Sequence, residues 1–434
     1  MNNIVVKNAT WIIVCKIVQA VISLVLTMLT ARYMGPSNYG LINYAASIVT
    51  FVVPIMQLGL NNILVREFIS QPDKEGEIIG TAIVMSVISA TCCIIGIINF
   101  SLIVNAGEKE VTIVCGLYSI MLIFQGVDLI EYWFQYRYLS KCTAIVSLLT
   151  YVVVSGYRIS LLITSRSIFW FAITNVLDYF IISLSLLIIY KSIGRAKLRW
   201  SFAMAKRLIK TGKYYILSGL MVTIFAQTDK IMLKIMVNDA ETGYYAAAIN
   251  CVSATSFVFA AIIDSMRPWI LTNKQKNIEK YKNSVMQLYS IIVYMALSVS
   301  LLITIFSNPI IEFLYGEKYL TSIKVLQILA WYTTFSYYGG AKDIWILAEG
   351  KQNYLVILNT SGAVMNIILN IMLIPQFGAC GAAIASLFTQ FYTNIIMGFI
   401  IKPLRENNNI LLKALNPMNL KSCVTYITSR KFID

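Results

Sequence analysis

The sequence predicts an all-α polytopic membrane protein with about twelve transmembrane helices. Hydrophobic residues make up 58% of the 434 residues, and charged residues only 13%. Apolar stretches of about twenty residues, the length that crosses a bilayer core, alternate with short polar joints along the whole chain. Only helices and closed barrels satisfy their backbone polar groups in lipid, and these stretches lack the alternation of barrel strands. We therefore expect every span to be a helix.

The joints are too short to fold as soluble domains, so the spans themselves make up the protein. Their limits follow the change from apolar to polar sequence. The predicted spans are residues 9–31, 40–65, 78–103, 111–134, 142–163, 168–190, 214–238, 244–264, 286–307, 322–348, 354–374 and 380–401.

Basic residues predict the orientation, because Lys and Arg are enriched in cytoplasmic loops. With a cytoplasmic N-terminus, 25 of the 35 basic residues fall in inner joints and tails, against five on the opposite side. We therefore expect a multi-pass protein of the cytoplasmic (inner) membrane with both termini inside. Contact with anionic membrane lipid accounts for the net charge of +15, and no nucleic-acid partner is expected.

The longest inner joint, residues 191–213, is basic and amphipathic and falls at the midpoint. It predicts a linker helix on the inner surface between a six-helix lobe, 1–190, and a second lobe, 214–401, followed by a basic cytoplasmic tail, 402–434. Six spans per half give both lobes one orientation, which suits a parallel repeat. A weak match of Tyr39–Ala45 to Thr242–Ala248 supports the repeat.

Absent residue types exclude several functions. The chain has no histidine, which rules out Ser-His-Asp and Cys-His catalysis and HExxH metal sites. It has no Walker A motif and therefore does not hydrolyse ATP by that route. The eight cysteines lie mostly within spans without a CxxC pair, so neither a disulfide nor a metal is expected. We predict no cofactor and no catalytic residues.

Charged residues inside spans are costly to bury and are candidates for function. The basic ones suit an anionic substrate, especially a phosphate. Lys16 lies near enough to the inner edge that it could equally extend towards water. The candidate substrate-binding cations are Lys16, Arg32, Arg158, Lys230, Lys234 and Lys342.

Polar side chains also recur at helical spacing on three spans. One such stripe could simply join helices by hydrogen bonds, but three on separate helices indicate a shared hydrated cavity. On the fourth span the stripe continues through Tyr132 to Gln135. The candidates are Gln125, Asp128, Asn359, Asn366, Asn370, Gln390 and Asn394.

Carboxylates within spans are candidates for ion coupling. Asp178 lies in the middle of its span without a neighbouring base in the sequence, and we take it as the better proton carrier. Asp229 and Asp343 each adjoin a lysine, which suits either an exchangeable pair or a structural one.

Several motifs resemble the polysaccharide-transporter branch of the multidrug/oligosaccharidyl-lipid/polysaccharide exporter superfamily, above all its O-antigen (repeat-unit) flippases. The first, Ala31–Gly40 (ARYMGPSNYG), is the most specific, and the resemblance covers nearly the whole chain. The supporting motifs are Gly59–Glu67, Thr228–Leu233, Gly243–Ala246 and Gly378–Ala385.

The resemblance implies two six-helix lobes around a central cavity that work by alternating access. It implies an undecaprenyl-pyrophosphate-linked oligosaccharide as substrate, polysaccharide polymerases as possible partners, and a role in O-antigen, lipopolysaccharide or capsule synthesis. Twelve spans argue against the fourteen-span flippases of peptidoglycan precursors.

Two other functions remain open at this stage. A multidrug/ion antiporter of the same superfamily would be expected to have a more apolar or acidic cavity. A membrane glycan polymerase would be expected to have a large outer loop with carboxylates or arginines. The outer joints here are short, so a flippase is the leading prediction and an enzyme is not expected.

Overall fold

The computed structural model describes residues 2–194 and 196–416, with side chains from Val18 onwards except that of Val21. This part of the chain is helical almost throughout and contains no strand, as predicted. Eight helical segments are long and apolar enough to cross a membrane, or nine if the bent pair of α10 and α11 forms one span. Each of α1 and α15 contains a break that divides it into two spans. These two breaks raise the nine spans of the described residues to eleven. The long helix α14 (Ser322–Ala348) corresponds to the one predicted span that is left, so the helices match the twelve predicted spans.

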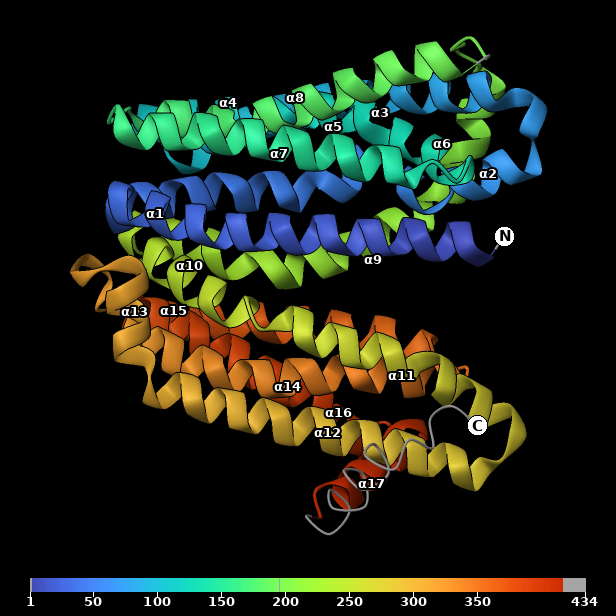
Figure 1. Ribbon diagram of the computed structural model, residues 1–434. Coiled ribbons are helices and arrows are strands. Elements are labelled where there is room, and N and C mark those ends of the chain that lie inside the picture. Colours follow the sequence, from blue (N-terminus) through green and yellow to red (C-terminus); the bar gives the residue numbers. More distant parts are fainter. Residues whose placement is uncertain (1, 195, 417–434) are drawn as a thin grey trace. The chain divides into compact units, whose positions relative to one another are not determined.

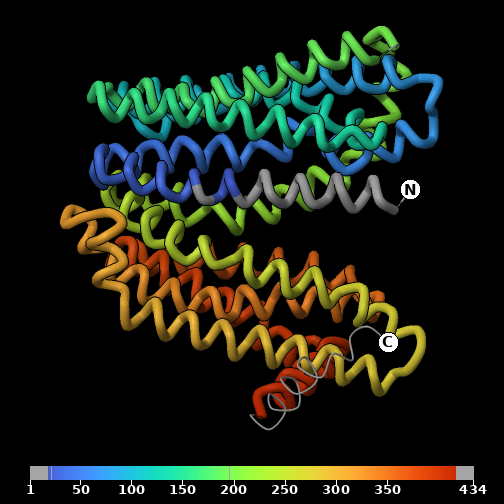
Figure 2. Tube along the Cα trace, in the orientation of Figure 1, coloured from blue at the N-terminus to red at the C-terminus, as the bar shows by residue number. Residues whose placement is uncertain are grey.

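The chain forms two compact units, residues 1–235 and 236–434. Figures 1 and 2 show each as a bundle of long helices. Unit 1 contains α1 (Asn2–Met56), α2 (Leu64–Ser70), α3 (Glu75–Val104), α4 (Lys109–Ser119), α5 (Met121–Val127), α6 (Glu131–Tyr136), α7 (Ser140–Ile163), α8 (Ile168–Ile193) and nearly all of α9 (Phe202–Met236). Unit 2 contains α10 (Asp239–Ser253), α11 (Ser256–Lys276), α12 (Ile278–Ile305), α13 (Ser307–Tyr315), α14, α15 (Asn353–Phe391), α16 (Met397–Ile400) and α17 (Arg405–Ala414).

The ARYMGP motif is the sharp turn that divides α1. Gly35 has φ 72°, a left-handed conformation that side chains disfavour, and Pro36 follows where the returning helix begins. The two arms of α1 then run side by side (Figure 1). The returning arm ends at Met56, and not near residue 65 as predicted, because Leu58 and Gly59 both have positive φ (52° and 69°).

The predicted linker helix of residues 191–213 is not a separate element. Residues 191–193 are the last residues of α8, and the non-helical segment 196–201 lies on α3, where the Gly76 carbonyl accepts from the Arg199 N–H at 3.0 Å. A side chain at Gly76 or Gly80 would collide with this segment, so the two glycines allow the close approach. Residues 202–213 are the first turns of α9, which continues without interruption into the predicted seventh span.

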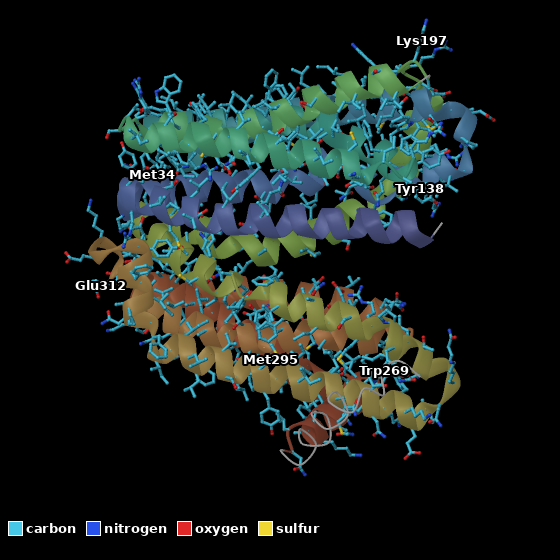
Figure 3. The ribbon with its side chains drawn as sticks, in the orientation of Figure 1. Met34, Tyr138, Lys197, Trp269, Met295 and Glu312 are labelled. Atoms are coloured by element: carbon cyan, nitrogen blue, oxygen red, sulfur yellow. The ribbon has the colours of Figure 1, made fainter. Side chains whose placement is uncertain are left out.

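Basic residues of this joint remain exposed, as Figure 3 shows for Lys197. Lys197 and Tyr138 lie at one end of unit 1, and Met34 at the opposite end. The joints near 138 and 197 therefore share one end of the bundle, as the predicted order of spans requires.

Apolar side chains fill both bundles. In unit 1 one cluster gathers around Phe68 and Trp133, and another around Tyr44 and Val114. In unit 2 one large cluster includes Trp345. Part of the predicted tail belongs to this core, because α17 buries Leu411 and Ala414; residues 417–434 of the predicted tail lie outside the described part of the chain.

Candidate functional site

A polar cluster lies inside unit 1 between α4, α5, α7 and α8. The Asn175 amide on α8 donates to the Tyr118 hydroxyl on α4 at 2.7 Å. Arg158 on α7 lies close enough to Asp178 on α8 and to Tyr118 for its charge to act on both. Asp178 is likewise within electrostatic range of Asp128, the residue that follows α5. We call these five residues the unit 1 cluster.

Each of the two carboxylates of the cluster has one buried oxygen that accepts no hydrogen bond from a described residue. Within the described residues, the Oδ1 atoms of Asp128 and Asp178 are buried and accept no hydrogen bond, and the same holds for Gln125 Oε1. Buried acceptors normally have a partner, because an unmade hydrogen bond costs about 1–3 kcal/mol. These two oxygens, of which that of Asp178 lies near Arg158, can receive a proton, a water molecule or a ligand that donates hydrogen bonds.

The predicted stripe on the fourth span is interrupted. A 3₁₀ turn, η3 (Asp128–Ile130), separates α5 from α6. Because a 3₁₀ turn has 3.0 residues per turn and not 3.6, the residues beyond it rotate away from the line set by Gln125 and Asp128. Gln135 is consequently exposed, and Tyr132 is half-buried.

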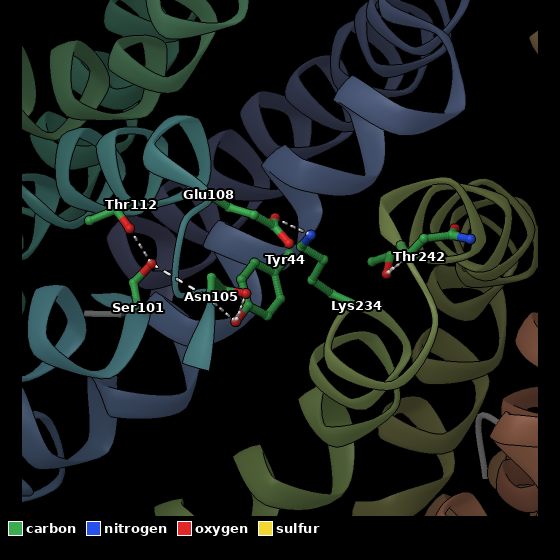
Figure 4. A network of polar contacts seen from close by, with 8 residues as sticks. Tyr44, Ser101, Asn105, Glu108, Thr112, Lys234 and Thr242 are labelled. Carbon is green, nitrogen blue, oxygen red and sulfur yellow. Dashed lines mark hydrogen bonds and ion pairs between the residues drawn. The ribbon is translucent and has the colours of Figure 1, made fainter. Parts of the chain in front are cut away.

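A second polar group in unit 1 lies at the far end of α9 (Figure 4). Lys234 is almost buried, with 6% of its side chain exposed, and pairs with Glu108 at 2.6 Å; the Glu108 side chain is 51% exposed. Beside this pair the Asn105 amide donates to the Tyr44 hydroxyl at 3.0 Å and to Ser101 at 3.4 Å. Lys234, predicted as a cavity cation, is therefore neutralised by a carboxylate 126 residues away.

Unit 2 contains a buried cluster around Lys342 of α14, which is 4% exposed. Its ammonium donates to the Thr393 carbonyl at 3.1 Å and to Asn394 Oδ1 at 2.8 Å. The Asn394 amide in turn donates to Gln390 Oε1 at 2.7 Å. Thr393 and Asn394 belong to a π-helix, η5 (Tyr392–Ile396), and such bulges loosen the regular backbone ladder. Lys342 thus bonds a carbonyl of this irregular turn.

The other predicted amides of unit 2, Asn359, Asn366 and Asn370, lie on α15. Asn370 donates to Asn366 Oδ1 at 3.1 Å, and Asn366 donates to the Ser386 hydroxyl at 3.5 Å; Asn366 and Asn370 are both fully buried. Asn359, predicted on the same stripe, is exposed, because it lies two turns nearer the start of α15, where its face of the helix is uncovered.

The remaining predicted residues occupy varied places. The side chain of Lys16 lies outside the described residues, and Arg32 is exposed before the Gly35 turn. Asp229 is buried beside Lys230, close enough for their charges to interact. Asp343 is exposed although Lys342 next to it is buried, because consecutive helical residues point to different faces.

The sequence analysis missed two carboxylates, Glu108 and Glu241, whose partners lie far away along the chain. Glu108 reaches Lys234, and Glu241 of α10 accepts from the Ala379 N–H at 2.6 Å. That N–H lies at the break of α15, where Gly378 has φ 54°. The sequence analysis used residues 378–385 only as a family motif, and nothing in the sequence linked them to Glu241.

No group of three or more Cys, Asp or Glu side chains in the described residues could hold a metal ion. Each unit instead offers buried cations and amides, which are suited to binding anionic and hydroxyl-rich groups. The unit 1 cluster adds carboxylates with free acceptor capacity.

Comparison with solved structures shows the fold. The chain superposes on a lipid II flippase, MurJ, in an inward closed conformation with a TM-score of 0.74, covering 98% of this chain and 93% of that one at 16% identity. It superposes on an inward-facing multidrug resistance MATE transporter with a TM-score of 0.67, covering 91% of this chain and 96% of that one, also at 16% identity. These likenesses establish the architecture alone, which flippases and drug exporters share.

Two curated proteins match about half of this chain. One is an uncharacterised membrane protein of Methanocaldococcus jannaschii, 26% identical over 50% of this chain and 44% of that protein. The other is a probable low-salt glycan biosynthesis flippase of Haloferax volcanii, 25% identical over 45% of this chain and 42% of that protein. The chain therefore aligns with less than half the length of each.

The family comparison covers more of the chain. Residues 29–324 match the polysaccharide biosynthesis protein family, and this range includes the ARYMGPSNYG turn and the motif that begins at Thr228. The resemblance drawn from those motifs is thereby confirmed. The chain belongs to the polysaccharide biosynthesis protein family of membrane proteins.

Proposed function

We propose that the protein is a flippase that moves polyprenyl-pyrophosphate-linked oligosaccharide repeat units from the inner to the outer leaflet of the cytoplasmic membrane by alternating access. Its substrate would be an undecaprenyl-pyrophosphate-linked oligosaccharide used for a surface polysaccharide such as O-antigen or capsule, with a polysaccharide polymerase as a possible partner. Both termini would be cytoplasmic.

Family membership over residues 29–324 is the observation that carries this proposal. The Haloferax relative, described as a probable glycan biosynthesis flippase, supports the same class of substrate. The buried polar groups support it further. Arg158 of unit 1 is half-buried and Lys342 of unit 2 is buried, and cations and amides there are suited to a pyrophosphate and sugar hydroxyls.

The two alternatives predict different chemistry. A multidrug/ion antiporter would move cationic drugs, which the cationic character of Lys342 and Arg158 disfavours. A glycan polymerase would lengthen the sugar chain, whereas a flippase leaves its substrate chemically unchanged. Product analysis therefore separates an enzyme from a transporter.

The test uses proteoliposomes loaded with a fluorescent lipid-linked oligosaccharide. We expect the protein to make inner-leaflet label accessible to a membrane-impermeant quencher, with no change in the mass of the lipid. Lys342→Ala and Arg158→Ala should slow this movement at least tenfold while the protein stays in the membrane. Normal flipping by both variants would refute a role for these cations, and no flipping by the parent would refute the proposal.

A deletion in the native host tests the same function in the cell. A flippase mutant should accumulate the complete lipid-linked repeat unit on the inner leaflet. A polymerase mutant should instead accumulate it on the outer leaflet, where externally added glycosidases can reach it.

A further inference from the structure

Unit 1 has an apolar groove between the returning arm of α1, α3 and α9, with a volume of about 410 Å³. Its walls include Phe51 and Ile55 of α1, Gly96 and Phe100 of α3, and Ile231 of α9. Among the described residues that line it, Thr228 alone has a hydroxyl or amide, and this hydroxyl donates to the Ile224 carbonyl of its own helix. The groove thus offers almost no hydrogen bond to a ligand.

The lining residues follow the helix axes. On α3 they lie at positions 93, 96, 97 and 100, and on α1 at 48, 51, 52 and 55, each a single stripe along one face. Seven residues at 1.5 Å per residue make the groove about 10 Å long. A side chain at Gly96 would meet nothing within 4 Å, so this wall is open. An elongated hydrocarbon is suited to such a groove.

The polar group drawn in Figure 4 lies beyond one end of the lining stripes. Tyr44 precedes the α1 stripe by one turn, and Asn105 and Glu108 follow the α3 stripe. Lys234 lies three residues after Ile231 on α9, a rise of about 4.5 Å. The half-exposed carboxylate of Glu108 holds its ammonium, so an incoming anion could exchange with Glu108 without moving the lysine.

We propose that the groove binds the first units of an isoprenoid chain and that Lys234 binds the phosphate attached to that chain. This proposal rests on the flippase function and names the site for its lipid carrier. In an isoprenoid phosphate the charged phosphate is attached directly to the first carbon of the hydrocarbon chain. The phosphate and the chain are therefore adjacent, as Lys234 and the groove are. In a glycerophospholipid, a glycerol and an ester separate the phosphate from the acyl chain.

The test measures binding of radiolabelled geranylgeranyl pyrophosphate to the full-length protein in nanodiscs of a neutral phospholipid. Gly96→Phe fills the groove and should weaken binding at least tenfold. Gly156→Phe is the matched control, because Gly156 on α7 also has open space beside it but does not line the groove. It should leave the affinity within about twofold.

Substitutions of Lys234 and Glu108 test the proposed phosphate site at the polar end of the groove. Lys234→Gln should weaken binding at least tenfold, whereas Glu108→Gln should strengthen it, because the phosphate no longer competes with a carboxylate. A photoreactive analogue of the same pyrophosphate should label α3 near residues 93–100. Equal effects of Gly96→Phe and Gly156→Phe, labelling elsewhere, or displacement by an equal concentration of dioleoyl phosphatidate would each overturn the isoprenoid site.

Flipping by the same variants separates this site from the proposed function. Parent protein that binds the isoprenoid but moves no lipid-linked oligosaccharide would refute the flippase and keep the groove. Parent protein that flips normally while its groove fails every binding criterion would refute the groove and keep the flippase.

Discussion

Replacing Gly339 by alanine should destabilise unit 2, although Ala is the better helix former. Gly339 and Gly340 are adjacent in α14. A methyl group at Gly339 would lie 2.8 Å from Asn394 Oδ1, the atom that accepts from Lys342. A methyl group at Gly340 would meet only the end of the Ile263 side chain at 3.4 Å, an ordinary contact. The neighbouring glycine is therefore a matched control.

The size of the effect follows from the hydrogen bond that the methyl group breaks and from the crowding it causes. Ala in place of Gly in a helix stabilises by about 0.5–1 kcal/mol. At Gly339 this gain is opposed by the loss of the Lys342–Asn394 hydrogen bond, about 1.5–3 kcal/mol for a charged donor, and by overpacking of about 1–3 kcal/mol. Gly339→Ala should thus lower the free energy of unfolding by about 1.5–5.5 kcal/mol, and Gly340→Ala should raise it by up to about 1 kcal/mol.

The assay is thermal unfolding of the purified protein in detergent. About 3 kcal/mol between the two variants corresponds to melting temperatures about 6–12 °C apart for a unit of this size. In an Asn394→Ala background the crowding is gone, so Gly339→Ala should no longer destabilise. Gly339→Ala protein as stable as Gly340→Ala protein would refute the role assigned to the Lys342–Asn394 contact.

Three further changes test other parts of the structure. Asp178→Asn keeps the shape of the side chain but cannot release a proton at this position, so reconstituted transport should lose its response to a pH gradient while substrate binding survives; an unchanged response would remove Asp178 from coupling. Gly35→Ala forces a side chain into a φ of 72°, which costs about 1–2 kcal/mol and should lower the melting temperature by a few degrees. Partial burial works to raise the pKa of Glu349, but the hydrogen-bonded Lys274 and the nearby Lys351 outweigh it and lower that pKa below its ordinary 4.5. The stabilisation by this ion pair is therefore present above pH 4.5 and lost as the pH falls below it, and Glu349→Gln should flatten that part of the curve of melting temperature against pH.

The sequence predicted the fold well because the signal was long and repeated. Each apolar stretch had to become a helix, since nothing else satisfies its backbone in lipid. The errors fell where short-range chemistry decides. The positive φ of Leu58 ended a predicted span early, and the close approach of residues 196–199 to Gly76 and Gly80 replaced a helix in the middle of the predicted linker.

For the polar groups, the sequence identified candidates but not their partners. Lys342, Gln390 and Asn394 are all buried in one hydrogen-bonded cluster. Glu108 and Glu241, however, lie in joints where an acid carries no special signal, and their partners are more than a hundred residues away. Such long-range pairs depend on how helices pack, which the spacing within one helix does not encode.

Two polar side chains of unit 2, those of Glu241 and Lys342, also stabilise irregular backbone. Glu241 accepts from the N–H at the break of α15, and Lys342 donates to a carbonyl of the π-helix. In lipid an unpaired backbone group costs several kcal/mol, so these side chains are needed for folding whether or not they also touch a substrate. Loss of activity on replacing these side chains therefore does not distinguish a role in folding from a role in substrate binding. Asp128 and Asp178 differ, because each keeps a buried oxygen without a hydrogen bond among the described residues. Replacing Asp128 removes a buried acceptor oxygen that no described group uses, whereas replacing Asp178 also alters its interaction with Arg158. A change in transport on replacing Asp128 therefore reports more directly on a bound proton or ligand.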